Sequence, residues 1–544
     1  MAYLATYGGP RSERRFSETA DVSLWSPLRQ TAFLGLFVAA FASNIGTWIQ
    51  NVAAAWLMTS LAPNALMVGL VQTLSGLPVF LLIIPAGALA DLVDRRRLLL
   101  FAQGWMFIAA ALLGWLTVEG AMTSWVLLLL TFVLGIGAAL NGPAWQATLP
   151  QLVPRDELTA AIALNGIQFN LARAIGPALG GVLIAAIGVG SAFLINAASF
   201  LGVVLLLYFW RREPTKSTLP AERLVGAIKA GIRYTRYSRP LTAVLVRAGA
   251  FVVGASAVPA LLPLYARNEL GAGATGYGVL LGFFGAGGVI GGLLMPQVRR
   301  HLSRDQTLSL SAVICAATTA ILAEVNVAEV AYAVMCLGGL AWVLGMTSLN
   351  VTAQVVVPQW VKARALASYQ LVVQGSMALG GLLWGGAASR STVPVALDLA
   401  AVLLVVGLAV GLRYRLSESE TFISEPLSLM PAPEVTSEIK PDAGPVMVSI
   451  EYEIDAARAT DFIHAMNALR TIRYRDGAVF WGLFWDVAKP SRYIEYFMVE
   501  SWSEHVRQHS RVTDEDGPAL ERARGFHIRP SPPIVSHEIA ATGK

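Results

Sequence analysis

Long apolar stretches, separated by short polar loops, make up most of residues 31 to 415. A helix that crosses a bilayer needs about 20 mostly apolar residues. The pattern predicts an all-α membrane protein with twelve transmembrane helices, six on each side of a basic linker at 211–240. The predicted spans are 31–59, 66–90, 97–118, 123–145, 160–187 and 191–210, followed by 241–265, 275–296, 307–324, 328–350, 363–388 and 393–412.

The charged loops predict how the chain is oriented. If residues 1–30 form a cytoplasmic tail, nearly all basic loop residues face the cytoplasm, as the positive-inside rule requires. No small-residue cleavage signature precedes the first span, so we interpret this segment as a cytoplasmic tail and not as a signal peptide. We expect a multi-pass protein of the cytoplasmic (inner) membrane with both termini in the cytoplasm. Arg267 and Arg390 remain on the opposite side, and the cytoplasmic loops contain Arg95, Arg96, Arg97, Arg155, Arg211, Arg212, Lys216, Arg223, Lys229, Arg233, Arg236, Arg239, Arg299, Arg300, Arg304, Lys362 and Arg364.

Composition agrees with a membrane protein. The 544 residues are 55% hydrophobic and only 14% charged, with a mean hydropathy of +0.58, which excludes a soluble protein of this length. Basic cytoplasmic loops account for the net charge of +5, so the lipid bilayer is the expected partner and nucleic acid is not. Cys315 and Cys336 lie inside apolar stretches without metal-ligand spacing, and we expect neither a metal nor a cofactor.

An internal repeat relates the two sets of six spans. It predicts two six-helix bundles, 31–210 and 241–415, related as parallel repeats. Two groups of residues carry the repeat: Gln146, Pro150, Gln151 and Val153 match Gln354, Pro358, Gln359 and Val361 at one constant offset, and Ala178–Gly181 matches Ala378–Gly381.

The segment GALADLVDRRRLL, residues 87–99, runs from the end of the second span through a very short charged loop into the start of the third. It resembles the signature loop of the major facilitator superfamily of transporters. The resemblance implies that Asp91 faces a helix N-terminus in the other half, where free N–H groups and the helix dipole stabilise a carboxylate. Asp94 stands where the family usually has glycine. The predicted cytoplasmic gate comprises Gly87, Asp91, Arg95, Arg96 and Arg97, and the alternative is a basic loop that only sets topology.

Three further segments narrow the resemblance. The segments at 44–61, 150–158 and 170–181 resemble the branch that contains siderophore exporters and transmembrane secretion effectors. In the fifth span, Gly176, Pro177, Gly180 and Gly181 resemble a motif associated with exporters. Proline bends a helix and glycine permits close approach of a neighbour, so tight packing of a kinked span is the alternative explanation.

Polar residues inside the spans predict the substrate cavity. Asn170 and Arg173 share one face of the fifth span with Pro177. A cation at mid-membrane costs about 2.5 to 3.5 kcal/mol and is a functional candidate. An isolated cation fits an anionic or oxygen-rich substrate, such as a carboxylate or catecholate. The other predicted cavity residues are Asn44, Trp48, Asn51 and Gln146, for which hydrogen bonding between helices is the alternative.

Proton coupling is expected for such an exporter, but the first six spans contain no central acid that would carry it. Asp91 and Asp398 are poor second choices for a protonatable group. Arg247 and Asp398 lie closer to span ends, where snorkelling toward water is enough to explain them.

Residues 446–544 predict a second domain after a flexible linker at 416–445. Alternating apolar residues predict strands near 448–454, 479–485, 493–499 and 533–539, with helices at 455–473 and 501–512. The order β-α-β-β-α-β is ferredoxin-like. It resembles small dimeric domains related to antibiotic-biosynthesis monooxygenases, which implies self-association through the sheet. His505 and His509 are four residues apart, and we interpret them as solvated helix-face residues instead of metal ligands.

We therefore predict an exporter of a small molecule, siderophore-like or another anionic or amphipathic metabolite or drug, that works by alternating access and is not an enzyme. The rival hypothesis is a membrane-anchored enzyme whose C-terminal domain carries the chemistry. Twelve spans with a half-to-half repeat are more than an anchor needs.

Overall fold

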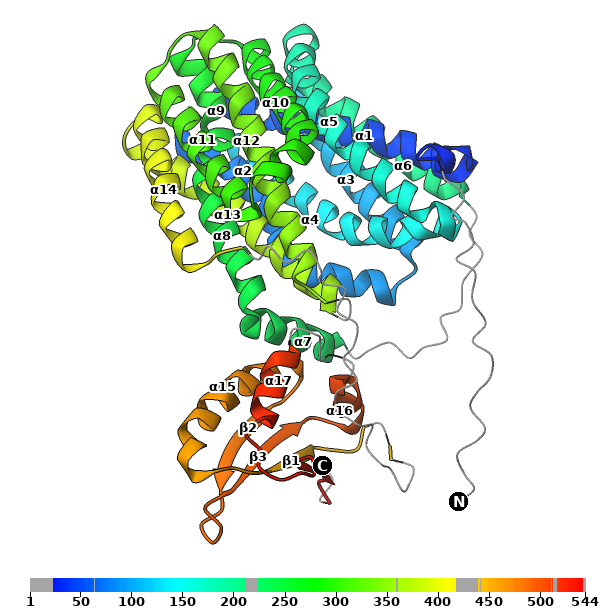
Figure 1. Ribbon diagram of the computed structural model, residues 1–544. Coiled ribbons are helices and arrows are strands. Elements are labelled where there is room, and N and C mark those ends of the chain that lie inside the picture. Colours follow the sequence, from blue (N-terminus) through cyan, green and yellow to red (C-terminus); the bar gives the residue numbers. More distant parts are fainter. Residues whose placement is uncertain are drawn as a thin grey trace.

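The computed structural model describes residues 23–62, 64–210, 224–358, 361–416, 439–440, 442–509, 511 and 516–541. Most of the predicted N-terminal tail and of the linker at 416–445 lies outside the described residues, as does the first part of the linker at 211–240. Figure 1 shows a large helical bundle with a small α+β domain beside one of its ends.

The bundle confirms the predicted fold class. Within the residues that the structure describes, twelve helical segments are long and apolar enough to cross a membrane. The seventh consists of α8 and α9 followed by a π-helical turn, Tyr265–Glu269. The first half contains α1 (Thr31–Leu61), α2 (Ala65–Leu92), α3 (Arg95–Val118), α4 (Ser124–Thr148), α5 (Leu158–Ile187) and α6 (Val189–Phe209), and the second contains α8 (Arg239–Ala255), α9 (Ala257–Leu264), α10 (Ala274–His301), α11 (Arg304–Glu324), α12 (Ala328–Val355), α13 (Lys362–Arg390) and α14 (Val393–Arg413).

Side-chain caps start several spans. Asn64 accepts a hydrogen bond from the N–H of Leu66 at the start of α2, and Asp94 accepts one from Arg97 at the start of α3. Ser303 and Gln306 form a reciprocal capping box at α11. These caps satisfy N–H groups that a helix leaves free, which explains why polar residues lie at these span boundaries.

The linker between the halves contains an amphipathic helix, α7 (Leu224–Tyr237). It packs on the second half, where the buried Tyr234 hydroxyl donates to the carbonyl of Val356 at 3.1 Å and Thr235 donates to Ser368 at 3.2 Å. We call the end of the bundle beside α7 the domain end and the opposite end the far end. Figure 1 shows α7 between the bundle and the C-terminal domain.

The C-terminal domain has the predicted ferredoxin-like order. Its strands are β1 (Val446–Glu453), β2 (Phe480–Trp485), β3 (Arg492–Val499) and β4 (Ile534–Ile539), in the antiparallel order β2-β3-β1-β4. The helices are α15 (Ala459–Asp476), α16 (Trp502–His509) and α17 (Gly517–Arg524), of which α17 was not predicted. One face of β1 and β3 packs against α15 around Phe462, which is fully buried.

The interpretation of His505 as a solvated residue is wrong. Its side chain is buried, and its ring centroid lies 4.8 Å from that of His537 on β4 and 5.4 Å from that of Trp502. Helix α16 turns this residue toward the sheet, a tertiary arrangement that the helical spacing does not show. The side chain of His509 lies outside the described residues.

Candidate functional site

Glycines bring the two halves together at the far end along two seams. In the first seam, a Cβ added at Gly181 on α5 would lie 2.5 Å from the Cα of Gly278 on α10. In the second, a Cβ added at Gly381 on α13 would lie 2.6 Å from the carbonyl oxygen of Gly69 on α2. Gly181 and Gly381 are matched by the sequence repeat, so both seams use the same residue at the same place in the fold.

The hydrogen bonds of one arginine and one pair of stacked rings also join the halves at this end. Arg267, which follows α9, donates to the hydroxyls of Thr59 at 3.0 Å and Ser60 at 2.9 Å at the end of α1. The rings of Trp56 on α1 and Tyr277 on α10 stack with centroids 6.0 Å apart. The bundle is therefore closed at the far end.

The predicted exporter motif holds α5 against two neighbours. A Cβ added at Gly176 would lie 2.6 Å from the Cβ of Trp48, and one at Gly180 would lie 3.1 Å from the Cα of Ile49. Pro177 lies inside α5 between these contacts. Gly176 and Gly180 therefore admit α1, while Gly181 admits α10 from the other half. Close packing accounts for all three glycines.

Arg173 lies between two tryptophans that come from different halves. Its guanidinium carbon is 5.9 Å from the ring centroid of Trp48 on α1 and 6.0 Å from that of Trp342 on α12. Within the described part of the chain, the guanidinium has these two ring contacts but no hydrogen bond and no carboxylate partner. A cation next to indole faces is attracted to them, and its N–H groups stay available to an anion.

Trp342 was missed by the sequence reasoning. A single tryptophan in the middle of the apolar span 328–350 was the only available signal, and an apolar span gives no reason to single it out. Its indole Nε1 is buried and, among the described residues, has no hydrogen-bond partner. The ring packs at 5.9 Å on Phe251 and lines a cavity of about 20 Å³ with Phe284, Met335 and Cys315. This volume suits one water molecule, not a metabolite.

The other predicted cavity residues are less closely grouped. Asn44 is half-buried on α1, and Asn51 is exposed. The exposed Asn170 donates its amide back to the carbonyl of Gly166 at 2.9 Å. Gln146 is exposed near the end of α4. The structure thus brings Arg173 and Trp48 together but shows no direct contact of Gln146 with them. Gln50, beside the predicted stripe, instead accepts a bond from Asn196 inside the first half at 2.6 Å.

The arginines of the predicted gate bind their own half. Arg95 donates to the carbonyl of Ala147 near the end of α4 at 2.9 Å. Arg96 donates to the carbonyls of Leu207 and Tyr208 at the end of α6, at 2.7 and 2.6 Å. Cations at helix C-termini are favourable, so these bonds fasten α3 to α4 and α6. Arg97 is exposed, and a Cβ added at Gly87 would meet open space.

The side chain of Asp91 lies outside the described residues. Its predicted partner in the other half therefore stays a prediction.

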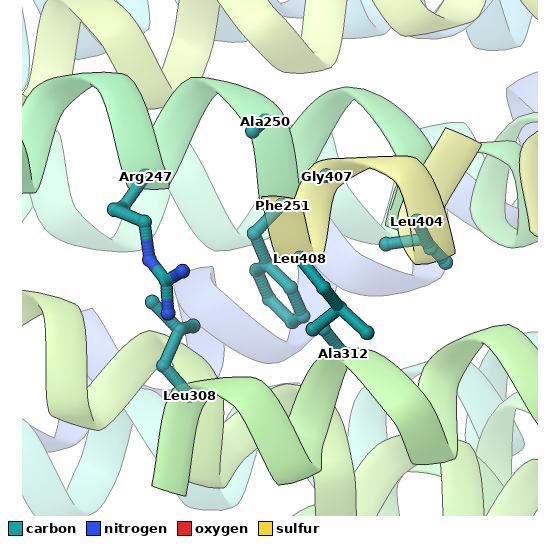
Figure 2. Close-up of a pocket in the computed structure, with 8 residues that line it drawn as sticks. All are labelled: Arg247, Ala250, Phe251, Leu308, Ala312, Leu404, Gly407 and Leu408. Atoms are coloured by element: carbon teal, nitrogen blue, oxygen red, sulfur yellow. The ribbon is translucent and has the colours of Figure 1, made fainter. Parts of the chain in front are cut away.

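Snorkelling does not explain Arg247. This residue is 4% exposed, lies 3.3 Å from Asp305 and donates to Ser309 at 3.2 Å. Figure 2 shows its guanidinium reaching from α8 toward Leu308 on α11. A Cβ added at Gly411 would overlap the guanidinium, so a side chain there would displace Arg247 from its present position. An ion pair thus ties α8 to α11, a contact between spans far apart in sequence that residue position within a span does not reveal.

A family model described as transmembrane secretion effector matches residues 22–544. The chain belongs to the transmembrane secretion effector family. The match includes the bundle and the C-terminal domain, so the two parts occur together in this family.

The chain is also similar in sequence to siderophore transporters. The staphyloferrin A transporter of Staphylococcus aureus is 28% identical over 281 residues, which cover 51% of this chain and 69% of that protein. The enterobactin exporter EntS of Shigella boydii is 30% identical over 284 residues, covering 51% and 66%. EntS of Salmonella choleraesuis is 28% identical over 370 residues, covering 67% and 87%.

Solved structures support the same fold. A bacterial homologue of the human lysosomal transporter Spinster superposes with a TM-score of 0.56 at 16% identity, covering 72% of this chain and 99% of that one. A POT family transporter gives 0.58 at 12% identity, covering 71% and 96%. At this identity the likeness establishes the major facilitator fold and nothing finer.

Proposed function

We propose that this secretion effector exports a small anionic molecule across the cytoplasmic membrane by alternating access, with Arg173 as the residue that binds the anion. The observation that carries the proposal is the position of Arg173 between Trp48 of the first half and Trp342 of the second. A ligand held there touches both halves, so its binding can be coupled to their relative motion.

The chemistry of the site favours an aromatic or oxygen-rich anion. Guanidinium forms strong, bidentate hydrogen bonds to carboxylate groups. The two indole rings offer flat apolar surface beside it, and the Nε1 of Trp342 is a further donor. Siderophore-like carboxylates and catecholates have this combination of features. The similarity in sequence to the staphyloferrin A transporter and the enterobactin exporter supports a siderophore-like substrate.

The closed far end corresponds to an inward-facing state if both termini lie in the cytoplasm. The basic loops support that orientation. In the outward-facing state, we expect the domain ends of the halves to converge. The predicted cytoplasmic gate of Gly87, Asp91, Arg95, Arg96 and Arg97 would form at that stage. Proton coupling belongs to the same proposal, and its protonatable residue is not assigned.

The C-terminal domain is proposed to have no enzymatic role. Its buried Arg473 donates to Glu495 at 2.9 Å, and the indole of Trp481 donates to the same carboxylate at 3.0 Å. These partners satisfy both charges and explain them as structural. The sheet face opposite α15 exposes Phe480 by 45% and Phe484 by 51%, and we propose that a second copy covers it.

The experiment compares small molecules inside and outside cells by mass spectrometry. The cells lack the protein, or carry wild type, Arg173→Ala, Val373→Ala or a chain cut after Leu416. Val373→Ala is the matched control, because the repeat that matches Gly181 to Gly381 also matches Arg173 to Val373. We expect an anion to accumulate inside the cells that lack the protein and in Arg173→Ala, and to be cleared by wild type and Val373→Ala.

Two outcomes would contradict this proposal. Clearance of every anion by Arg173→Ala at the wild-type rate would remove Arg173 from the site. A chemical change of a metabolite that follows the C-terminal domain alone would favour the membrane-anchored enzyme.

A further inference from the structure

Helix α7 presents a second contact face away from the bundle. Arg233 and Tyr237 are one helical turn apart and therefore share this face. The ring of Tyr237 stacks on Tyr474 of α15 with centroids 5.4 Å apart and planes 15° apart. Arg233 donates to Glu504 of α16 at 3.0 Å. Two helices of the C-terminal domain thus dock on one face of α7.

Glu504 is held in place from inside the C-terminal domain. Arg511, whose side chain is 5% exposed, donates to both carboxylate oxygens at 2.6 and 3.1 Å and to the carbonyl of Asp476 at 2.6 Å. Burial raises the pKa of Glu504, but the bonds and charges of Arg511 and Arg233 outweigh it and hold that pKa below its ordinary range. The carboxylate therefore stays ionised at neutral pH, and the ion pair with Arg233 persists.

The end of α15 leaves room for this ion pair. Gly477 follows the helix with φ of +140°, a conformation that L-residues with side chains rarely adopt. A Cβ there would lie 3.1 Å from Glu504 Oε1, 3.2 Å from Arg511 Nη1 and 3.5 Å from Arg233 Nη2. The backbone of the C-terminal domain is therefore shaped around the contact with α7.

Helix α7 also lies in the segment of the chain that connects the two halves. Ser238 alone separates it from α8 of the second half, and residues 211–223 connect it to α6 of the first half. Tyr234 and Thr235 fix it to the domain ends of α12 and α13. Any rocking of one half against the other must move α7 relative to the first half.

We propose that the C-terminal domain is an intramolecular clamp, which docks on the Arg233 and Tyr237 face of α7 and stabilises the state that is closed at the far end. A contact that is stronger in one state shifts the equilibrium toward that state by the difference in its free energy. The clamp sets the balance between states and does not depend on which molecule is exported.

The test measures two distances in the full-length chain in lipid nanodiscs, by pulsed electron paramagnetic resonance of nitroxide labels. Cys315 and Cys336 are first replaced by alanine. Labels at Ile463 and Arg413 report docking of the C-terminal domain. Labels at Glu119, which directly follows α3, and at Glu324, which ends α11 in the other half, report the far end.

We expect wild type to give a narrow docking distance and a short far-end distance. Arg233→Ala and Tyr237→Ala should broaden the former and lower the ratio of closed to open far ends by about fivefold, the lower range of allosteric couplings. Tyr237→Phe keeps the ring stack, and Arg239→Ala removes an exposed arginine just beyond α7, so both should match wild type.

A broad docking distance in wild type would overturn the proposal. So would broadening in Arg233→Ala with an unchanged far-end ratio, because docking would then not be coupled to the bundle. Neither readout requires a substrate, so failure here is distinguishable from failure of the export proposal.

Discussion

The two seams at the far end differ in their chemistry although each is built around a glycine at the matching position of the repeat. On α5, the residues that precede Gly181 by eight and by four are Arg173 and Pro177; on α13, the residues that precede Gly381 by the same steps are Val373 and Met377. The second seam instead has a direct hydrogen bond, from the hydroxyl of Thr73 on α2 to the carbonyl of Ala378 at 2.8 Å. The repeat therefore duplicates the closing surface, whereas Arg173, the proposed anion-binding residue, is matched by Val373 in the second seam.

The largest difference between the seams should appear on removing the cation. Arg173→Ala should lower export of the identified anion about 10- to 100-fold, because a hydrogen bond to a charged group contributes about 1.5 to 3 kcal/mol. Val373→Ala, at the matching position, should retain most of the activity. Uptake into everted membrane vesicles measures both rates, and equal losses would mean that the seams do not differ in binding.

The shared glycines should respond alike. Gly181→Val and Gly381→Val each place a side chain where a Cβ is already too close to backbone. Overpacking costs about 1 to 3 kcal/mol, so each should lower the closed far-end population about fivefold or more. The label pair at Glu119 and Glu324 measures it. Gly202→Val is the control, since a Cβ there meets nothing within 4 Å, and an effect of Gly181→Val alone would refute equivalence of the seams.

A smaller effect should distinguish the arginine contacts that hold helices together within each half, Arg247 in the second half and Arg96 in the first. Arg247→Met removes the ion pair with Asp305 and should lower the free energy of unfolding by about 1 to 3 kcal/mol. Arg96→Met removes bonds to two partly exposed carbonyls and should cost about 1 kcal/mol. Thermal unfolding in detergent measures both. The double variant Arg247→Met with Asp305→Leu should recover part of the loss, and no recovery would contradict the ion-pair explanation.

The smallest expected effect is pH dependence at α16. Burial lowers the pKa of His537, opposed by the charge of Glu538. A buried neutral histidine loses stabilisation as pH falls below its unfolded pKa of about 6.5. Protection of the α16 amides in the full chain, taken from hydrogen-exchange rates corrected for their intrinsic pH dependence, should therefore fall from pH 7.5 to 5.5 more in wild type than in His537→Asn. An equal fall in both would remove His537 as the cause.

Features that depend on local pattern could be predicted from the sequence. Apolar length predicted the spans, and period-two alternation predicted the strands of the C-terminal domain. Arg173 could be singled out because a cation in a span needs an explanation. Trp342, the partner of Arg247 and the contact face of α7 could not, because each depends on residues that meet only in the folded chain, more than 50 positions apart in sequence.

The most direct test is calorimetric binding of the identified anion to the purified full-length protein. With Arg173 between Trp48 and Trp342 as the anion site, Arg173→Ala should raise Kd about 10- to 100-fold, while Val373→Ala leaves it near the wild-type value. An unchanged Kd in Arg173→Ala, or the same rise in both variants, would contradict the assignment of the site to Arg173.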